Sequence, residues 1–251
     1  MQAQTAIHGD ATRSSVASRI AAPIHDRSHT AHVNPHAGAH VSPHVSAHAD
    51  TLDQTMRLMG AQMSYSRNSE IFGENEPAEY LYKVVSGSVR TYKILSDGRR
   101  QIGGFYLPGD IFGLEFADQH ALSAEAITDV KVLVVKRSAI NSLAGRDATV
   151  SQQLFTLTGR ELHRAQDHIL LLIKSAQERV ASFLLEMSER GRGGNAIELP
   201  MSRQDIADYL GLTIETVSRT LSLLEDAAAI EVPTSRRIVL RNRPALNRLN
   251  G

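Results

Sequence analysis

The segment 202–224 constrains the fold most strongly, because it contains two short amphipathic patterns separated by a glycine. Ser202 is followed three residues later by Asp205, a spacing typical of the capping box that begins a helix. Gly211 lies in a tight turn, and Thr213 is suited to cap a second helix. That second helix has a buried stripe of three aliphatic residues, Val217, Leu221 and Leu224. A helix, a glycine-containing turn and a capped helix together predict a helix-turn-helix.

Three polar residues of the second helix, at about residues 214 to 226, project away from this apolar stripe: Glu215, Ser218 and Arg219. The exposed N-terminal end of such a helix enters the DNA major groove. There a carboxylate accepts a hydrogen bond from cytosine, a guanidinium donates to guanine O6 and N7, and a hydroxyl does either. Taken alone, the spacing of Glu215 and Arg219 is more typical of an ordinary surface salt bridge. The interpretation as base-reading residues therefore depends on the motif around them.

The residues after the second helix predict a hairpin wing. Two apolar runs, 230–232 and 238–240, flank a turn that would place Arg236 and Arg237 near the DNA backbone. From Val232 to the C-terminus there are five Arg and no acid, although a solvated tail would have the same composition. The whole chain has 27 basic and 27 acidic residues, so its net charge gives no support for nucleic-acid binding. Three hydroxyl residues near the helix starts are further candidates for backbone contacts: Ser202, Thr213 and Thr216.

Short strands are predicted in the N-terminal half. From about Glu70 to Arg137, alternating or apolar runs are separated by Gly and Pro. The four clearest runs are Tyr80 to Val85, Ser88 to Leu95, Gln101 to Leu107 and Val130 to Val135. Gly87 and Gly98 are placed for hairpin turns, because Gly accepts the positive φ that such turns need. Several short strands at this spacing indicate a sandwich or a barrel.

A long helix is predicted between these two regions. From Leu154 to about Glu189 the chain has one Gly and no Pro, which favours a nearly continuous helix. A heptad-like seam of apolar and small residues runs along it: Phe155, Thr158, Leu162, Ala165, Ile169, Leu172 and Ala176. Such a stripe normally buries against its own domain, but a protruding helix of this length needs a second copy to cover it. We therefore expect a homodimer formed through four of these residues, Leu162, Ala165, Ile169 and Leu172.

The composition excludes several classes of protein. The chain of 251 residues has no Cys, which rules out disulfides, thiolate-bound zinc and cysteine-ligated iron–sulfur clusters. No apolar run approaches the roughly 20 residues of a membrane helix, and the N-terminus has no apolar signal region. We therefore expect a cytoplasmic protein without membrane contact.

The first 50 residues mix Ala, Ser, His and Pro with little periodicity, a composition typical of disorder. They contain eight of the eleven His, and five of these recur at every fourth position from His32 to His48. Pro35, Gly38 and Pro43 oppose a helix in that stretch, so low-complexity sequence is favoured over a metal site.

The expected fold is α+β in four parts. A disordered segment at 1–50 precedes a beta-roll (jelly-roll-like) sensor domain at 51–148. A dimerisation helix at 149–175 follows, and then a winged helix-turn-helix domain at 176–251.

These blocks together resemble the superfamily of the cyclic-AMP receptor protein and FNR over about Glu70 to Leu246. The runs 81–90 (LYKVVSGSVR), 97–102 (DGRRQI) and 107–110 (LPGD) look like the family's beta-roll. The run 202–213 and the residues Glu215 to Arg219 are similar to the FNR and FixK branch, whose signature is E-x-x-S-R.

The resemblance implies a transcription regulator, expected to be an activator. Glu215, Ser218 and Arg219 would read half-sites like TTGA in an inverted repeat upstream of promoters. RNA polymerase would be the protein partner, and the setting would be an oxygen-responsive or nitrogen-fixation cascade.

Two departures from the family pattern indicate which branch of the family the chain resembles. Cyclic-AMP binders carry an Arg-Ser or Arg-Thr pair after a Gly-Glu in the roll, whereas here Gly113-Leu114-Glu115 is followed by Leu122-Ser123. A buried phosphate without its guanidinium partner is costly, so no cyclic nucleotide is expected. FNR proper holds an iron–sulfur cluster through Cys, which this chain lacks. The FixK type, with no cofactor, fits best.

Two alternative classes of function involve the histidines of the chain. In one, haem or a metabolite bound through His120, His163 or His168 gates the same DNA-binding module. In the other, the protein is an enzyme; jelly-roll metal enzymes gather His and carboxylates across strands, but 70–137 contains only His120. An enzyme is therefore not expected.

Overall fold

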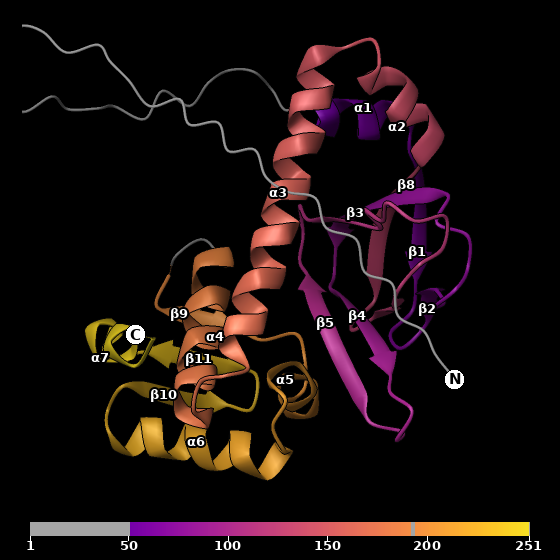
Figure 1. Cartoon of the computed structure of the whole chain (residues 1–251). Coiled ribbons are helices and arrows are strands. Elements are labelled where there is room, and N and C mark those ends of the chain that lie inside the picture. The colour runs from indigo at the N-terminus through magenta and orange to yellow at the C-terminus, as the bar shows by residue number, and fades with distance from the viewer. Residues whose placement is uncertain (1–50, 192–193, 251) are drawn as a thin grey trace, which may run out of the picture. The chain divides into compact units, whose positions relative to one another are not determined.

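Two antiparallel four-stranded sheets form the sensor domain in the computed structural model, which describes residues 51–191 and 194–250 (Figure 1). The strand order of the first sheet is β1 (Ala61–Tyr65), β8 (Val130–Lys136), β3 (Tyr80–Ser86) and β6 (Ile111–Phe112). The order of the second is β2 (Glu70–Phe72), β7 (Ser123–Ala126), β4 (Val89–Ile94) and β5 (Arg100–Tyr106). The segment expected to be disordered, with its regularly spaced histidines, lies outside the described residues.

The core of the sensor domain draws side chains from both sheets. Its buried members are Phe72, Tyr82, Val84, Val89, Phe112, Ala124, Ala126, Val130 and Val132. The four predicted strands correspond to β3, β4, β5 and β8, and their ends differ from the predicted ones by one residue at most. Gly87 and Gly98 have φ values of 80° and 83° at the two predicted turns. The expected two-layered β domain is confirmed.

Several short elements have no counterpart among the predicted ones. They are the strands β1, β2, β6 and β7 and the helices α1 (Thr51–Met59), α2 (Arg137–Ala144) and α7 (Arg243–Asn250). Segments of this length hold too few repeats of a periodic pattern to be distinguished from loops. Helices α1 and α2 close one end of the sensor domain, where Leu52, Met56 and Ile140 are buried in a second apolar cluster.

The long helical region contains two helices, so the prediction of a nearly continuous helix is wrong. Helix α3 (Ala148–Leu171) begins at Asp147, whose carboxylate accepts from the Thr149 and Val150 amides. Helix α4 (Ala176–Arg190) begins at Ser175, which forms a capping box with Glu178. The sequence pattern Ser-x-x-Glu marks this second start. A new cap inside an amphipathic run ends one helix and begins the next.

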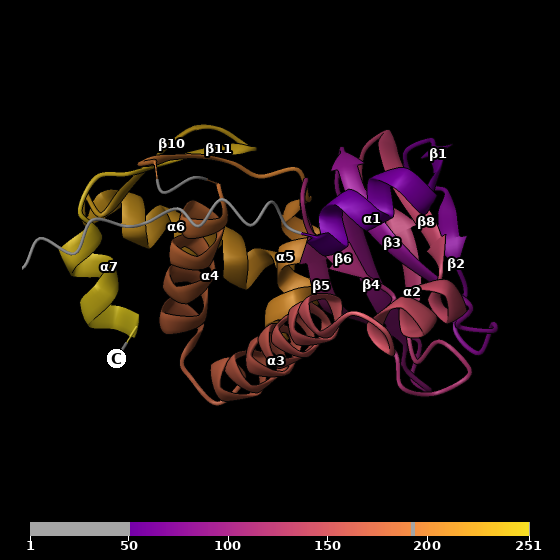
Figure 2. The same ribbon diagram turned by 90° about the horizontal axis from the view of Figure 1, so that it is seen from above.

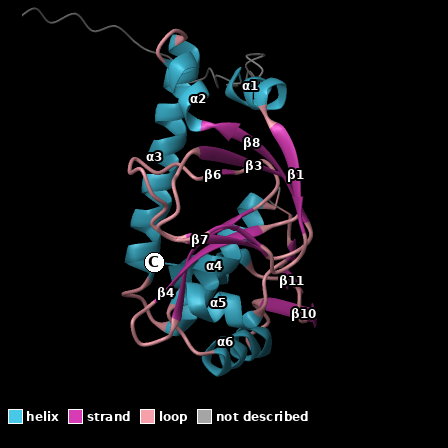
Figure 3. Ribbon diagram, turned by 90° about the vertical axis from the view of Figure 1, so that its right-hand side faces the viewer, coloured by secondary structure: helices cyan, strands magenta, loops and turns pink. Residues whose placement is uncertain are grey.

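The C-terminal half is built from α4, α5 (Arg203–Leu210), α6 (Ile214–Asp226) and a small sheet (Figures 2 and 3). Strands β10 (Ile230–Thr234) and β11 (Arg237–Leu240) form the predicted hairpin wing, and β9 (Ala196–Glu198) pairs with β11. Buried side chains from every part of this half share one core, including Phe183, Leu210, Leu224, Ile230 and Leu240. The expected winged helix-turn-helix is confirmed.

Candidate nucleic-acid interface

Helix α5 begins and ends at the residues that its sequence signals indicate. The hydroxyl of Ser202 accepts from the Asp205 amide at 3.1 Å, and Asp205 Oδ2 accepts from the Ser202 amide at 3.0 Å. The helix ends at Gly211, whose left-handed conformation (φ 62°, ψ 40°) is disfavoured for a residue with a Cβ. This turn sets the angle at which the second helix leaves.

Helix α6 presents one apolar face and one polar face. The Thr213 hydroxyl accepts from the Thr216 amide at 3.2 Å and so caps the helix. On the inner face, Val217, Leu221 and Leu224 are only 0%, 4% and 1% exposed. Because this face is anchored in the core, the opposite face is turned to solvent, at the end of the described unit away from α1 and α2 (Figures 1 and 3).

The three residues predicted to read bases have different surroundings. Glu215 and Arg219 are exposed, and no ion pair of the described residues joins them, so the alternative of an ordinary salt bridge is not formed. The backbone amide of Glu215 and the Thr213 hydroxyl lower the pKa of the Glu215 carboxyl. Ser218 is half-buried and accepts from Arg203 Nη1 at 3.3 Å. Arg203, the first residue of α5, was not among the predicted site residues.

The predicted backbone contacts lie around the same surface. Ser202 is exposed, but its hydroxyl also donates to Asp205 Oδ2 at 2.8 Å and is therefore engaged in the helix cap. The hydroxyls of Thr213 and Thr216 are 3.1 Å apart and bond to each other.

The two arginines of the wing are not equivalent. Both amides, of Arg236 at 3.3 Å and of Arg237 at 3.0 Å, donate to the Thr234 hydroxyl, which orders the turn. Both side chains are exposed, but Arg237 Nε lies 3.6 Å from Glu198 Oε1. No ion pair of the described residues includes Arg236, so it is the freer of the two to approach a phosphate.

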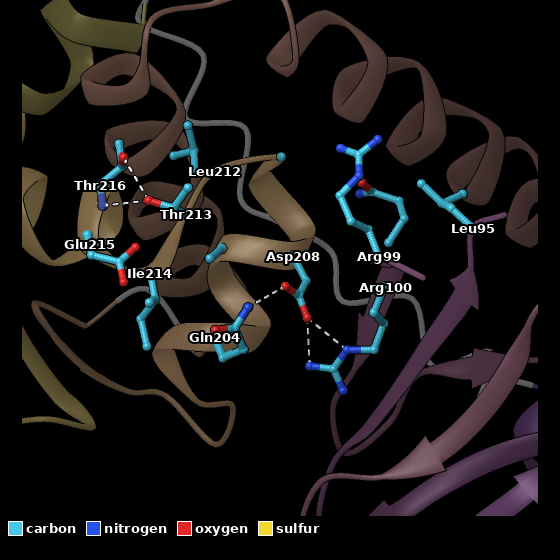
Figure 4. Close-up of a pocket in the computed structure, with 13 residues that line it drawn as sticks. Leu95, Arg99, Arg100, Gln204, Asp208, Leu212, Thr213, Ile214, Glu215 and Thr216 are labelled. Atoms are coloured by element: carbon cyan, nitrogen blue, oxygen red, sulfur yellow. Dashed lines mark hydrogen bonds and ion pairs between the residues drawn. The ribbon is translucent and has the colours of Figure 1, made fainter. Parts of the chain in front are cut away.

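A cleft of about 720 Å³ borders the start of α6 (Figure 4). One wall is the β4–β5 hairpin, with Arg99 and Arg100. The other is α5 and the first turn of α6, with Asp208 and Glu215. Across the cleft, Arg100 Nε donates to Asp208 Oδ2 at 2.8 Å. The sensor sheet is thus tied directly to the first helix of the helix-turn-helix.

Leu122, the residue before Ser123, points toward β5 in the roll. It packs so closely over Gly103 that a Cβ at that position would lie 2.6 Å from Leu122 Cδ1. Both residues line a second cavity of about 720 Å³ between β5 and α3. Leu122 offers an apolar methyl group there and no charge for a phosphate.

The three histidines considered as ligands have separate partners. His120 is 1% exposed, stacks on Phe72 with 3.6 Å between ring centroids and has Nδ1 3.0 Å from Glu115 Oε1. His163 is exposed, with Nε2 3.5 Å from Asp167 Oδ2. The Nε2 atom of His168 lies 2.7 Å from the Tyr209 carbonyl oxygen. Within 51–191 and 194–250, no three His, Cys, Asp or Glu side chains gather as a metal site would require.

The two domains match known family models. Residues 178–249 match the Crp-like helix-turn-helix domain, and residues 62–147 match the cyclic nucleotide-binding domain. The order and the arrangement of these domains are those of the CRP/FNR transcription regulators. The chain belongs to this family, and it is a DNA-binding regulator and not an enzyme.

Within the family, the chain is similar to FixK proteins. It is 51% identical over 203 residues to the nitrogen fixation regulation protein FixK of Azorhizobium caulinodans, covering 78% of this chain and 82% of that protein. The FixK protein of Rhizobium meliloti is 41% identical over 187 residues, 74% of this chain and 85% of the relative. The solved structure of FixK2 from Bradyrhizobium japonicum has 54% identity and a TM-score of 0.74, over 77% of this chain and 98% of that one. The chain therefore lies in the FixK-like branch.

No helix among the described residues is both long and apolar enough to cross a membrane.

Proposed function

We propose that the protein binds as a homodimer to an inverted repeat of TTGA-type half-sites and activates transcription through contact with RNA polymerase. Its setting is the cytoplasm, in an oxygen-responsive or nitrogen-fixation cascade. The observation that carries the proposal is the polar face of α6, where Glu215 and Arg219 are exposed and unpaired with each other. A carboxylate and a guanidinium one turn apart suit the cytosine and guanine edges of such a site. The names of the FixK relatives support the nitrogen-fixation setting.

The seam of α3 supports the dimer. Phe155, Leu162 and Ile169 are 82%, 60% and 65% exposed, and Leu172 is 37% exposed. Ala165, between them, is exposed as well. In aqueous solution, large apolar side chains at this spacing are normally buried against a second helix with the same pattern. A twofold axis along α3 presents two copies of α6 to two half-sites, which is the geometry an inverted repeat requires.

The proposed regulator needs no small-molecule effector. The roll has Leu122-Ser123 where the family pattern of cyclic-AMP binders has an Arg-Ser or Arg-Thr pair, and the three candidate histidines have separate partners. In the alternative, a haem or a metabolite would gate the same DNA module. An absorbance spectrum of the purified protein tests the haem form of this alternative, because a haem protein absorbs strongly in the visible range.

Binding selection from a random pool of duplex oligonucleotides tests the proposal. The expected product is an inverted repeat of TTGA-type half-sites whose centres are about one helical turn, 10 to 10.5 base pairs, apart or a multiple of it. Enrichment of single half-sites would contradict the dimer, and enrichment of an unrelated sequence would contradict the assigned reading residues.

A further inference from the structure

Five charged side chains lie between the second sensor sheet and α5, and we name them the bridging cluster: Arg90, Arg100, Glu125, Asp205 and Asp208. Arg90 donates to Glu125 Oε1 at 2.7 Å and to Asp205 Oδ1 at 3.0 Å. Arg100 donates to Asp205 Oδ1 at 2.6 Å and to Asp208 Oδ2 at 2.8 Å. Two arginines from adjacent strands therefore hold two carboxylates from one helix.

Asp205 divides its two carboxylate oxygens between two tasks. Oδ2 accepts from the amide and hydroxyl of Ser202, which completes the cap of α5. Oδ1 accepts from Arg90 and Arg100 of the sensor sheet. The carboxylate that begins the first helix of the helix-turn-helix is thus the one that attaches this helix to the sensor domain.

The cluster is shielded from water. The side chains of Arg90 and Asp205 are only 10% and 4% exposed, and those of Arg100 and Asp208 are 23% and 13% exposed. Burial on its own lowers the pKa of Arg100, but the bonds and charges of Asp208 and Asp205 outweigh it and raise that pKa above its ordinary value. Removing one partner of such a buried ion pair leaves a poorly solvated charge.

Apolar contacts also join β5 to the C-terminal half, but they restrict the position of α5 less strictly than the bridging cluster does. Phe105 of β5 packs against Phe183 and Tyr209, with ring centroids 6.2 Å and 5.2 Å apart. Such contacts are non-directional and tolerate small sliding movements. Charge-assisted bonds from a planar guanidinium to two carboxylates are satisfied in only a narrow range of positions. Buried ionic groups of this kind are best suited to selecting one register between packed elements.

We propose that the bridging cluster positions α5, and with it α6, so that the two reading helices of the dimer are held at one separation. The consequence is selectivity for the length of the spacer between half-sites, and Arg90, Arg100 and Asp208 are positioning residues for it. This inference rests on the proposed dimer and its inverted-repeat site. One extra base pair moves a half-site by about 3.4 Å and about a tenth of a turn. A reading helix held by the cluster cannot follow that displacement, whereas a released one can.

The test compares Arg100→Gln, Asp208→Asn and the double variant with the wild-type protein. Arg99→Gln is the matched control, because Arg99 is the neighbouring residue on the same hairpin, and among the described residues its side chain bonds only Asp97 of its own turn. Each full-length protein is titrated with three operators, which carry the selected spacer or a spacer one base pair shorter or longer. Sedimentation and circular dichroism establish that each variant is a folded dimer. If Arg100→Gln does not fold, the near-isosteric Asp208→Asn carries the test.

Wild type and Arg99→Gln should prefer the selected spacer by about tenfold or more, which corresponds to about 1.4 kcal/mol. In Arg100→Gln and Asp208→Asn the preference should fall to about twofold, and the double variant should be no worse than the more affected single variant, because both changes break the same link. A purely structural role would lower the affinity for all three operators in proportion. Folded variants that keep the wild-type preference would overturn the inference alone. A wild-type protein that ignores spacer length would overturn the proposed dimeric site together with it.

Discussion

Replacing Ile169 and Leu172 together by Asp should convert the dimer into monomers. These side chains are 65% and 37% exposed in the single chain, which together is roughly one fully exposed aliphatic side chain per protomer. Burying such a side chain is worth about 1.5 to 3 kcal/mol, so the two protomers lose about 3 to 6 kcal/mol. The dimer dissociation constant should rise by a factor of about 10² to 10⁴, and four carboxylates at the seam raise it further.

Sedimentation equilibrium at micromolar concentration measures this change, and circular dichroism verifies that α3 remains helical. Leu58→Asp is the matched control, since Leu58 is 79% exposed but lies on α1, outside the seam. The seam variant should sediment as a monomer and lose tight operator binding, while the control remains a dimer. A seam variant with the mass of a dimer would refute the assignment of these residues to the interface.

Three further results are expected. Titration with cyclic AMP should give no heat and no change in DNA affinity, because the roll has Leu122-Ser123 and lacks the Arg-Ser or Arg-Thr pair of cyclic-AMP binders; a saturable micromolar signal would show a different binding mode. Arg236→Ala should weaken binding to all DNA sequences alike and lower the salt slope by about one unit, and a sequence-dependent loss would argue against a phosphate contact. Glu215→Ala should relax the preference at the paired cytosine. Since its folded-state pKa is lowered, the wild-type preference should persist down to the usual Glu range and disappear only as the pH falls through that lowered value, so an earlier loss would contradict the role of this carboxylate.

The parts of the fold that were predictable are those with local signals. The cap at Ser202, the left-handed Gly211 and the stripe ending at Leu224 all lie within one short segment, and the structure forms each of them. The turn at Gly98 was equally visible. The break between α3 and α4 lies at the predicted domain boundary but departs from the expected nearly continuous helix, because the amphipathic pattern continues across the capping box at Ser175.

The contacts between the sensor domain and the helix-turn-helix could not be predicted. Arg100 and Asp208 are 108 residues apart in the chain, and Arg90 and Asp205 are 115 apart. Nothing in the local pattern around an arginine on a strand indicates which distant carboxylate it meets. The capping box correctly predicts that Asp205 lies at the start of α5. The two partners of its other carboxylate oxygen, Arg90 and Arg100, depend on tertiary packing and have no local signal.

The most direct test of the central claim, that α6 reads DNA bases, is the affinity of Arg219→Ala for matched and mismatched operators. Arg219 is exposed on the polar face of α6, so its loss should leave the fold intact. If it donates to guanine, the change should cost roughly 1 to 3 kcal/mol on the TTGA-type site and much less on a site in which that guanine is already replaced. An equal loss on both sites would make Arg219 a backbone contact and would contradict the assigned orientation of the reading helix.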